Sequence, residues 1–114
     1  MIEITKVQEE DIFVLNVIGD VDASSSIELD SAISSSLEEG HGKILVDCKS
    51  LNYISSAGLG VFMSYIQELE SREITLVLCN MNDKVQSVFE LLGLDQLLKI
   101  TVNKGQAKKF LDEL

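Results

Sequence analysis

The sequence is poor in positive charge, and this shortage excludes several kinds of partner. Its 114 residues contain nine Lys and Arg against nineteen Asp and Glu, which gives a formal net charge of −10. Nucleic-acid affinity depends on basic side chains that neutralise phosphates, and an anionic membrane surface attracts the same side chains. We therefore expect neither a nucleic acid nor a membrane as partner.

Long apolar runs, proline and linkers are also lacking. No run approaches the roughly 18 apolar residues of a membrane span, and the opening MIEITKV has no basic segment followed by an apolar one. The cytoplasm is the expected location. There is no proline, low-complexity linker or internal repeat. Because single cores usually run to about 100–150 residues, we expect one domain over 1–114.

Residues for catalysis are few. The only histidine, His41, lies between two glycines, where we expect a solvated loop. A serine hydrolase needs G-x-S-x-G with a later histidine, whereas this chain has I-S-S-A-G at 54–58 and its histidine comes earlier. No glycine-lysine pair stands in the frame of a phosphate-binding loop. We expect no enzyme activity and no cofactor.

No group of residues has the spacing of a metal site. Cys48 and Cys79 each close a strand-like run without metal-ligand neighbours, so buried, reduced thiols are expected. Asp20 and Asp22 are spaced like a carboxylate pair, but two acids at a strand end without a third ligand are more often turn-formers. We therefore predict no metal.

Strand-like segments begin with a pair at the N-terminus. Residues 2–8 and 12–18 are rich in β-branched and aromatic residues and flank the charged turn EED, which predicts a hairpin. The short apolar runs KILVDC and ITLVLC do not alternate, which favours strands covered on both faces. A last strand is expected near LLKIT.

Four segments show the apolar spacing of helices. The first is predicted to start with a capping box of Ser25 and Glu28 and to end near Gly40, and the third to start at an Asn82 cap and end at Gly93. The apolar stripes are Leu29, Ala32, Ile33 and Leu37; Leu59, Phe62, Met63, Ile66 and Leu69; Val85, Val88, Phe89 and Leu92; and Ala107, Phe110, Leu111 and Leu114.

The order of these segments predicts the fold class. An N-terminal β-hairpin is followed by alternating helices and strands. Apolar helix stripes must be buried against a sheet, and the hairpin adds an antiparallel pair to otherwise repeating units. We therefore expect an α/β sandwich with a mixed sheet covered by helices.

The stretch YISSAGLG (residues 53–60) places two adjacent hydroxyls before a helix. Ser56 is predicted to be the N-cap, a purely structural role worth about 1 kcal/mol. A serine at a helix entrance is also half exposed, and Gly58 would open backbone access beside it. A phosphoryl group there would meet free N–H donors and the positive helix end, so the fold would tolerate phosphorylation. Both interpretations stay open at this point.

Four landmarks in order and spacing resemble one known family. They are Ile18-Gly19-Asp20-Val21-Asp22, Ile44-Leu45-Val46-Asp47, YISSAGLG at 53–60 and Phe89-Glu90-Leu91-Leu92-Gly93-Leu94. The chain resembles the STAS domain of bacterial anti-sigma-factor antagonists over essentially its whole length. The resemblance implies a regulatory protein that binds an anti-sigma factor with serine kinase activity and so frees a sigma factor.

The resemblance also implies which residues act. In the family pattern D-S-[ST]-G-L, the serine after the aspartate is phosphorylated by the kinase, and a PP2C-type phosphatase reverses it. Ser56 takes this position, Ser55 replaces the aspartate and is the second choice of acceptor, and a monomer or weak dimer is expected. The alternative is a phosphorylation-independent subunit of a stress-signalling, transporter or lipid-trafficking complex. The implied partner-binding residues are Asp20, Asp22, Ser55, Ser56, Ala57, Gly58 and Leu59.

Overall fold

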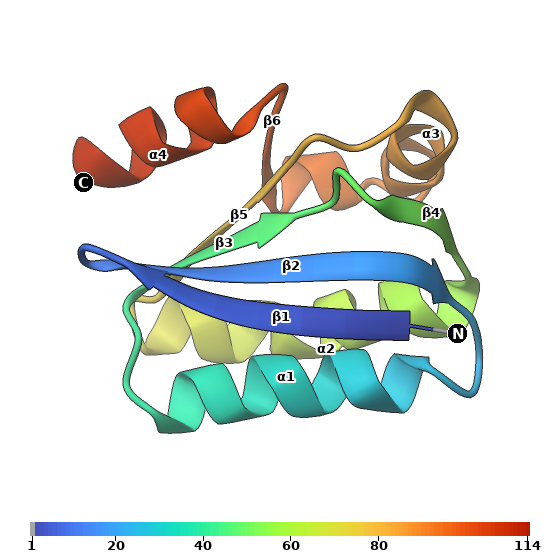
Figure 1. Cartoon of the computed structure of the whole chain (residues 1–114), viewed down its shortest axis with the longest axis horizontal. Helices are drawn as coiled ribbons and strands as arrows, with labels where there is room; N and C mark the ends of the chain where they lie inside the picture. Colours follow the sequence, from blue (N-terminus) through green and yellow to red (C-terminus); the bar gives the residue numbers. More distant parts are fainter. Residues whose placement is uncertain (1) are drawn as a thin grey trace.

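A mixed six-stranded sheet forms the centre of the computed structural model, which describes residues 2–114 (Figure 1). Its order is β1-β2-β3-β5-β6, and β4 pairs with the end of β2. The β1–β2 pair is antiparallel and the other pairs are parallel, as expected for the predicted fold class. The strands are β1 Ile2–Glu9, β2 Ile12–Val21, β3 Lys43–Asp47, β4 Leu51–Ile54, β5 Thr75–Cys79 and β6 Lys99–Thr101.

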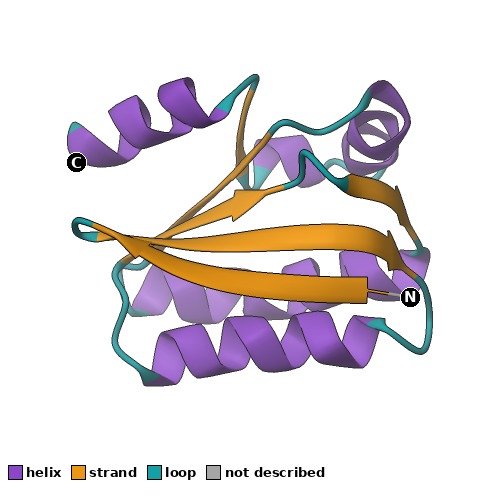
Figure 2. Cartoon of the chain, in the orientation of Figure 1, coloured by secondary structure: helices purple, strands orange, loops and turns teal. Residues whose placement is uncertain are grey.

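Helices cover the sheet on both faces. Helices α1 and α2 lie side by side beneath one face, with their N-termini at the same end of the molecule (Figures 1 and 2). Helix α3 packs beside β4, and α4 covers part of the opposite face against β3 and β5. The helices are α1 Ser26–Glu38, α2 Ser56–Ser71, α3 Asp83–Leu91 and α4 Lys104–Asp112, with a short 3-10 turn, η1, at Leu94–Gln96.

The two faces of the sheet carry separate apolar cores. The larger core joins the sheet to α1, α2 and α3, and its centre includes Leu15, Ile33 and Phe89. The smaller core packs Ala107 and Leu111 of α4 onto the other face. Burial on both faces explains why the strand sequences KILVD and TLVLC do not alternate.

The two thiols are buried and reduced, as the sequence predicted. Cys48 belongs to the larger core and Cys79 to the smaller one, so they lie in different cores and form no disulfide. Burial raises the pKa of the Cys48 thiol well above its usual range and that of Cys79 to about 12. Both thiols therefore stay protonated and unreactive at neutral pH.

Three predicted helix ends are confirmed, and the predicted start of α1 is wrong. Asn82 Oδ1 accepts from the backbone N–H of Val85 at 2.8 Å, and Gly40 and Gly93 adopt left-handed φ values of +85° and +74° where their helices end. The predicted capping box at Ser25 does not form. The Ser25 hydroxyl donates to Asp22 and to the Asp20 carbonyl oxygen, so the loop before α1 uses it instead.

Some apolar residues of the predicted stripes face solvent. Met63 and Leu92 are each 50% exposed and Leu114 is 63% exposed, so their predicted burial is wrong. Met63 lies at the margin of the arc through which α2 contacts the core. Leu92 and Leu114 lie beyond the last residues of α3 and α4, so no helix directs them toward the core. His41 is not a solvated loop residue, because its ring stacks on Phe13 with the centroids 3.9 Å apart.

Strand β4 has no counterpart among the predicted elements. Its four residues, LNYI, show a buried-exposed-exposed-buried pattern that fits neither strand alternation nor a continuous apolar run. The second strand also continues past its predicted end at residue 18 to Val21, because β4 pairs with this extension. No helix of residues 2–114 is both long and apolar enough to cross a membrane.

Candidate functional site

The N-terminus of α2 lies where β2 and β4 end, and we call residues 54–59 the α2 entrance. Val21 and Ile54 pair at the ends of these strands, and the backbone N–H of Ser55 donates to the Val21 carbonyl oxygen at 2.8 Å. The strand pairing therefore continues to the residue before α2 begins. This contact fixes the position and direction in which the helix starts.

Ser55, and not Ser56, caps α2. Ser55 has extended backbone angles (φ −85°, ψ 171°), and its Oγ accepts from the Gly58 N–H at 3.3 Å. Ser56 is the first residue of the helix. The predicted cap was therefore one residue too late, because the β2 contact holds Ser55 extended and an N-cap needs that backbone conformation.

Ser56 has the more available of the two hydroxyls. Ser56 is exposed, whereas Ser55 is half-buried. Within residues 2–114 the Ser56 side chain makes no hydrogen bond, while the Ser55 hydroxyl is used by the cap. Because Ser56 is the first helical residue, the free N–H groups and positive end of the helix lie beside it.

Gly58 and Leu59 support the entrance from inside. Both are buried, and a methyl group at Gly58 would stand 2.6 Å from Val21 Cγ1 and 2.7 Å from Ile54 Cγ1. The expectation that Gly58 opens backbone access is therefore wrong: it allows α2 to approach the strands closely. Ala57, between Ser56 and this buried pair, is exposed.

Asp22 shapes the loop beside the entrance. Its Oδ1 accepts from both the backbone N–H and the hydroxyl of Ser24 and of Ser25, at 2.8–3.0 Å. These hydrogen bonds hold the pKa of the Asp22 carboxyl well below its usual range. Asp22 is thus a turn-former, as the sequence predicted, whereas Asp20 is an exposed residue of β2 that pairs with Tyr53.

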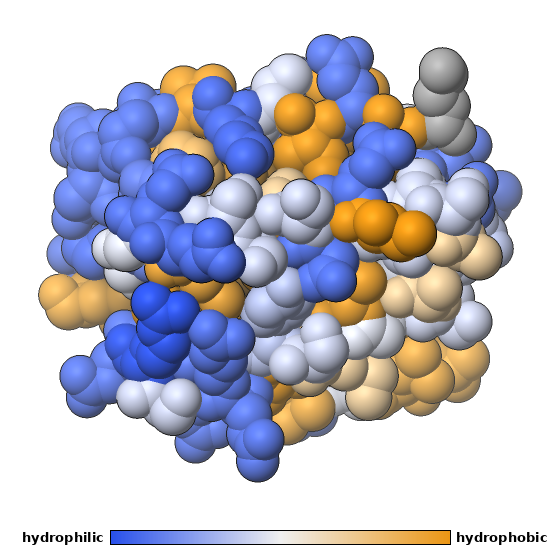
Figure 3. Space-filling model, turned by 90° about the horizontal axis from the view of Figure 1, so that it is seen from below, coloured by the Kyte–Doolittle hydropathy of each residue, from blue (hydrophilic) through white to orange (hydrophobic). Residues whose placement is uncertain are grey.

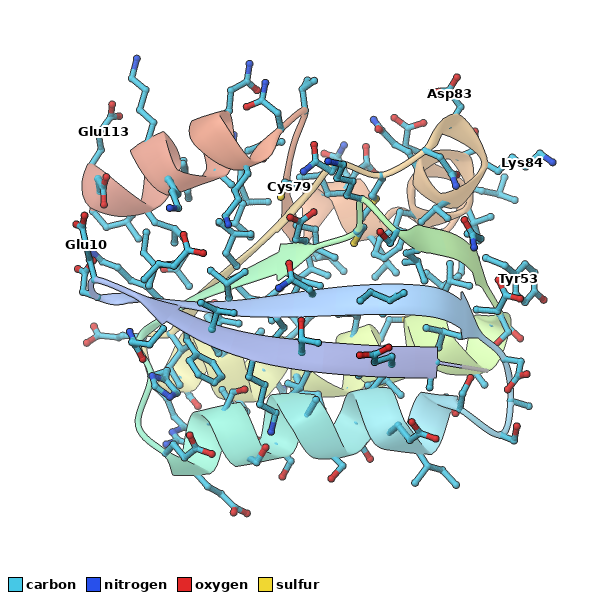
Figure 4. The ribbon with its side chains drawn as sticks, viewed as in Figure 1. Glu10, Tyr53, Cys79, Asp83, Lys84 and Glu113 are labelled. Carbon is cyan, nitrogen blue, oxygen red and sulfur yellow. The ribbon has the colours of Figure 1, made fainter. Side chains whose placement is uncertain are left out.

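A shallow hollow next to the entrance was not found from the sequence. It holds about 230 Å³ between β4 and α3, and Tyr53, Lys84 and Val88 line it with their neighbours. Tyr53 is 53% exposed, and Figure 4 shows it at the same end of the molecule as Asp83 and Lys84. An aromatic residue two positions before the pair of serines was the available signal, but without β4 the orientation of its side chain could not be derived.

The chemistry of the entrance is that of a modifiable surface. It offers one free hydroxyl and a helix N-terminus, and the exposed ring of Tyr53 lies directly before it. Among residues 2–114, no cluster of three or more His, Cys, Asp or Glu is placed to hold a metal ion. The free hydroxyl can accept a phosphoryl group from an enzyme that reaches this surface.

Comparison with known proteins finds a matching family model and similar proteins. The family model described as STAS domain matches residues 3–107. The anti-sigma-B factor antagonist of Staphylococcus aureus is 26% identical over 97 residues, which cover 85% of this chain and 88% of that protein.

Solved structures share the fold. The anti-sigma factor antagonist SpoIIAA in its unphosphorylated form superposes with a TM-score of 0.73 at 17% identity, over 100% of both chains. The phosphorylated form of the Bacillus cell fate determinant SpoIIAA superposes with a TM-score of 0.70 at 18% identity, over 96% of this chain and 99% of that one.

Proposed function

Because this chain belongs to the STAS domain family, we propose that it acts as an anti-sigma-factor antagonist. Its unphosphorylated form binds an anti-sigma factor that has serine kinase activity, and this binding releases a sigma factor. Phosphorylation of Ser56 by the same kinase ends the interaction. The relative from Staphylococcus aureus is named an anti-sigma-B factor antagonist, which supports the proposed role as an antagonist. The chain acts as one cytoplasmic domain over 1–114, without catalysis of its own.

The observation that carries this proposal is the difference between two adjacent serines. The Ser56 hydroxyl is exposed and makes no hydrogen bond within residues 2–114, while the Ser55 hydroxyl is half-buried and caps the helix. A kinase must bring the acceptor hydroxyl to its ATP, and only a free hydroxyl can be presented without breaking a cap. Ser56 is therefore the preferred acceptor and Ser55 the second choice.

The domain can tolerate a phosphoryl group on Ser56, whereas a complex whose partner covers the α2 entrance cannot. A phosphoryl group on Ser56 meets the free N–H groups and positive end of α2, so the domain tolerates it. It adds a charge of about −1.5 to −2, and the chain already carries −10. A partner that covers the entrance would have to bury this dianion or separate, and a buried unpaired charge costs several kcal/mol.

The side chain at position 55 bears on recognition by the kinase. The family pattern has an aspartate there, and in this chain a neutral serine caps the helix instead. Ser55 can cap as well as a carboxylate does, but it offers a kinase no negative charge beside the acceptor. A PP2C-type phosphatase completes the cycle by removing the phosphoryl group, and the chain works as a monomer or weak dimer.

Phosphosite mapping tests the proposal. The purified chain is incubated with ATP and the kinase-type anti-sigma factor of the same genome, and the modified residue is identified by mass spectrometry. We expect one phosphate on Ser56, none in Ser56→Ala, and continued modification in the matched variant Ser55→Ala. Modification that persists in Ser56→Ala and disappears in Ser55→Ala would move the site by one residue. Binding without any modification, unaffected by ATP, would support the scaffold alternative.

A further inference from the structure

The sheet is incomplete along the edge formed by β6. This strand, the last in the sheet order, pairs only with Val77–Cys79 of β5, whereas β3 on the other side of β5 pairs with all of Thr75–Cys79 (Figure 1). The chain before β6 forms the η1 turn instead of a longer strand. No residue of β6 therefore stands beside Thr75 or Leu76, and the sheet has a gap at this corner.

A hollow lies at this gap, and we call it the edge hollow. It holds about 260 Å³ and is lined by residues of α2, β5, β6 and α4. Its apolar lining includes Ile66, Leu69, Leu76 and Phe110. Ile66 and Phe110 are only half-buried, so the edge hollow presents apolar surface that the rest of the chain does not cover.

An exposed leucine stands at the rim of the edge hollow. Leu97 lines the hollow and is 59% exposed, whereas the next residue, Leu98, is 7% exposed. An apolar knob and an apolar hole thus lie side by side on one surface. In a two-fold dimer both copies contribute the same surface, so the knob of each copy can fill the hole of the other.

The charges around the edge hollow are self-complementary as well. Glu70 of α2 and Lys99 of β6 are its two charged residues, and neither belongs to an ion pair found in residues 2–114. Lys99 Nζ lies over the Phe110 ring, 4.9 Å from its centroid. The adjoining hollow on α4 shares these two residues and adds Lys109 and Glu113, again one charge of each sign. A partner with charges of one sign would meet a like charge here, whereas a second copy can place each Lys against a Glu.

The net charge of the chain restricts where a second copy can bind. Residues 97–114 contain four Lys against one Asp and one Glu, whereas residues 1–96 contain five basic side chains against seventeen acidic ones. Two copies that met through acidic surfaces would repel each other. Figure 3, which views the molecule from the side of α1 and α2, shows hydrophilic and weakly polar residues with scattered hydrophobic ones. The C-terminal segment, which supplies Leu97, Lys99 and Phe110, is thus the part through which two acidic copies can meet.

We propose that the edge hollow is the interface of a weak two-fold dimer of this chain. Leu97 of each copy packs into the edge hollow of the other copy, and Lys99 of each copy approaches Glu70 of the other. Glu70 lies about 20 Å along α2 from Ser56, at about 1.5 Å per residue. The dimer therefore leaves both α2 entrances free. It goes beyond the proposed switch and forms in both states of Ser56.

Sedimentation velocity of the full chain tests the dimer. We expect the average sedimentation coefficient to rise from the monomer toward the dimer value between about 10 μM and about 1 mM, the range of a weak dimer. Leu97→Ser should raise the dissociation constant about tenfold. The matched control is Leu92→Ser, because Leu92 is also exposed but does not line the edge hollow, and this variant should dimerise normally. A chain that stays monomeric over this range, or equal losses in the two variants, would overturn the proposal.

A charge exchange tests the two-fold contact itself. Lys99→Glu and Glu70→Lys each place like charges together at both symmetric contacts, and each should weaken the dimer about tenfold. Glu70→Lys also reduces the net negative charge, so overall repulsion cannot explain its loss. The double variant restores opposite charges and should regain most of the affinity.

Two outcomes of these variants would overturn the proposed arrangement. A double variant that dimerises no better than the single ones would show that Lys99 and Glu70 do not meet across the interface. Ser56→Ala should dimerise like the unmodified chain, because Ser56 lies outside the edge hollow. A loss of the dimer in Ser56→Ala would place the interface at the α2 entrance instead.

Discussion

Gly58 of α2 lies against Val21 of β2 so closely that no side chain fits between them. A Cβ atom at Gly58 would stand 2.6 Å from Val21 Cγ1, whereas one at Gly60, half a turn further along the helix, would meet nothing within 4 Å. The same helix thus contains one glycine that the packing requires and one that it does not. Gly58 sets how near the α2 entrance lies to the strands.

The two glycines should respond oppositely to alanine. We expect Gly58→Ala to destabilise the chain by about 1–3 kcal/mol, because overpacking forces Val21 and Ile54 to move. Gly60→Ala should stabilise it by about 0.5–1 kcal/mol, because alanine loses less backbone entropy in a helix. Urea denaturation of both variants measures this. A Gly58→Ala variant as stable as Gly60→Ala would contradict the close packing.

Phe62 should be the strongest single contact of α2 with the core. It is 3% exposed, and its ring lies 5.7 Å from that of Phe89 on α3. Phe62→Ala should therefore cost about 3–5 kcal/mol. Met63→Ala, at the neighbouring half-exposed residue, should cost less than about 1 kcal/mol. Equal losses in denaturant melts would mean that the helix is rotated from the described orientation.

Local patterns predicted the elements that tertiary contacts do not alter. The hairpin, the two strands covered on both faces and the Asn82 cap follow from residue type and spacing alone. Strand β4 could not be predicted, because its four residues carry no period and their pairing with β2 is a tertiary contact. The environment of His41 was misjudged for a similar reason, because Phe13, on which its ring stacks, lies far from it in the sequence, on β2.

The N-cap of α2 was predicted to within one residue. Two adjacent serines have the same capping chemistry, so the sequence alone could not tell which one caps α2. The choice is made by the contact between Ser55 and Val21, which extends the backbone at Ser55. The buried state of Gly58 and Leu59 depends on the same helix orientation. The exposed Tyr53 was missed because β4 was missed.

Asp22 should make the stability of the chain depend on pH in the acid range. Hydrogen bonds from the Ser25 backbone N–H and from the hydroxyls of Ser24 and Ser25 lower the pKa of its carboxyl. An unfolded aspartate has a pKa of about 3.9. A folded pKa below this value stabilises the fold at higher pH, and this contribution is lost as the pH falls from about 4 toward the folded pKa.

Asp22→Asn should therefore lower the unfolding free energy at pH 7 and differ less from the unmodified chain at pH 3. Denaturant melts at both pH values measure the difference. The matched control is Asp20→Asn, because the Asp20 carboxylate accepts no hydrogen bond within residues 2–114 and its loss should change little. A deficit of Asp22→Asn that is the same at both pH values would rule out the titration as its cause.

The final prediction concerns the affinity for the anti-sigma partner. Phosphorylation of Ser56 should weaken binding roughly a hundredfold or more, since ~2.7 kcal/mol corresponds to two decades and a misfit buried charge costs at least that much. Ser56→Asp should weaken it less, because one carboxylate carries less charge than a phosphoryl group. Calorimetric titration of the three forms against the purified partner measures the order.

Alanine at the two serines separates charge from helix capping. Ser56→Ala should bind like the unmodified chain and be equally stable, because its hydroxyl makes no hydrogen bond within residues 2–114. Ser55→Ala removes the cap to Gly58 and should cost about 1 kcal/mol of stability while leaving the charge unchanged. If Ser56→Ala lost affinity as strongly as the phosphorylated form, the hydroxyl itself would be a binding contact. The switch would then act by removing that contact and not by adding charge.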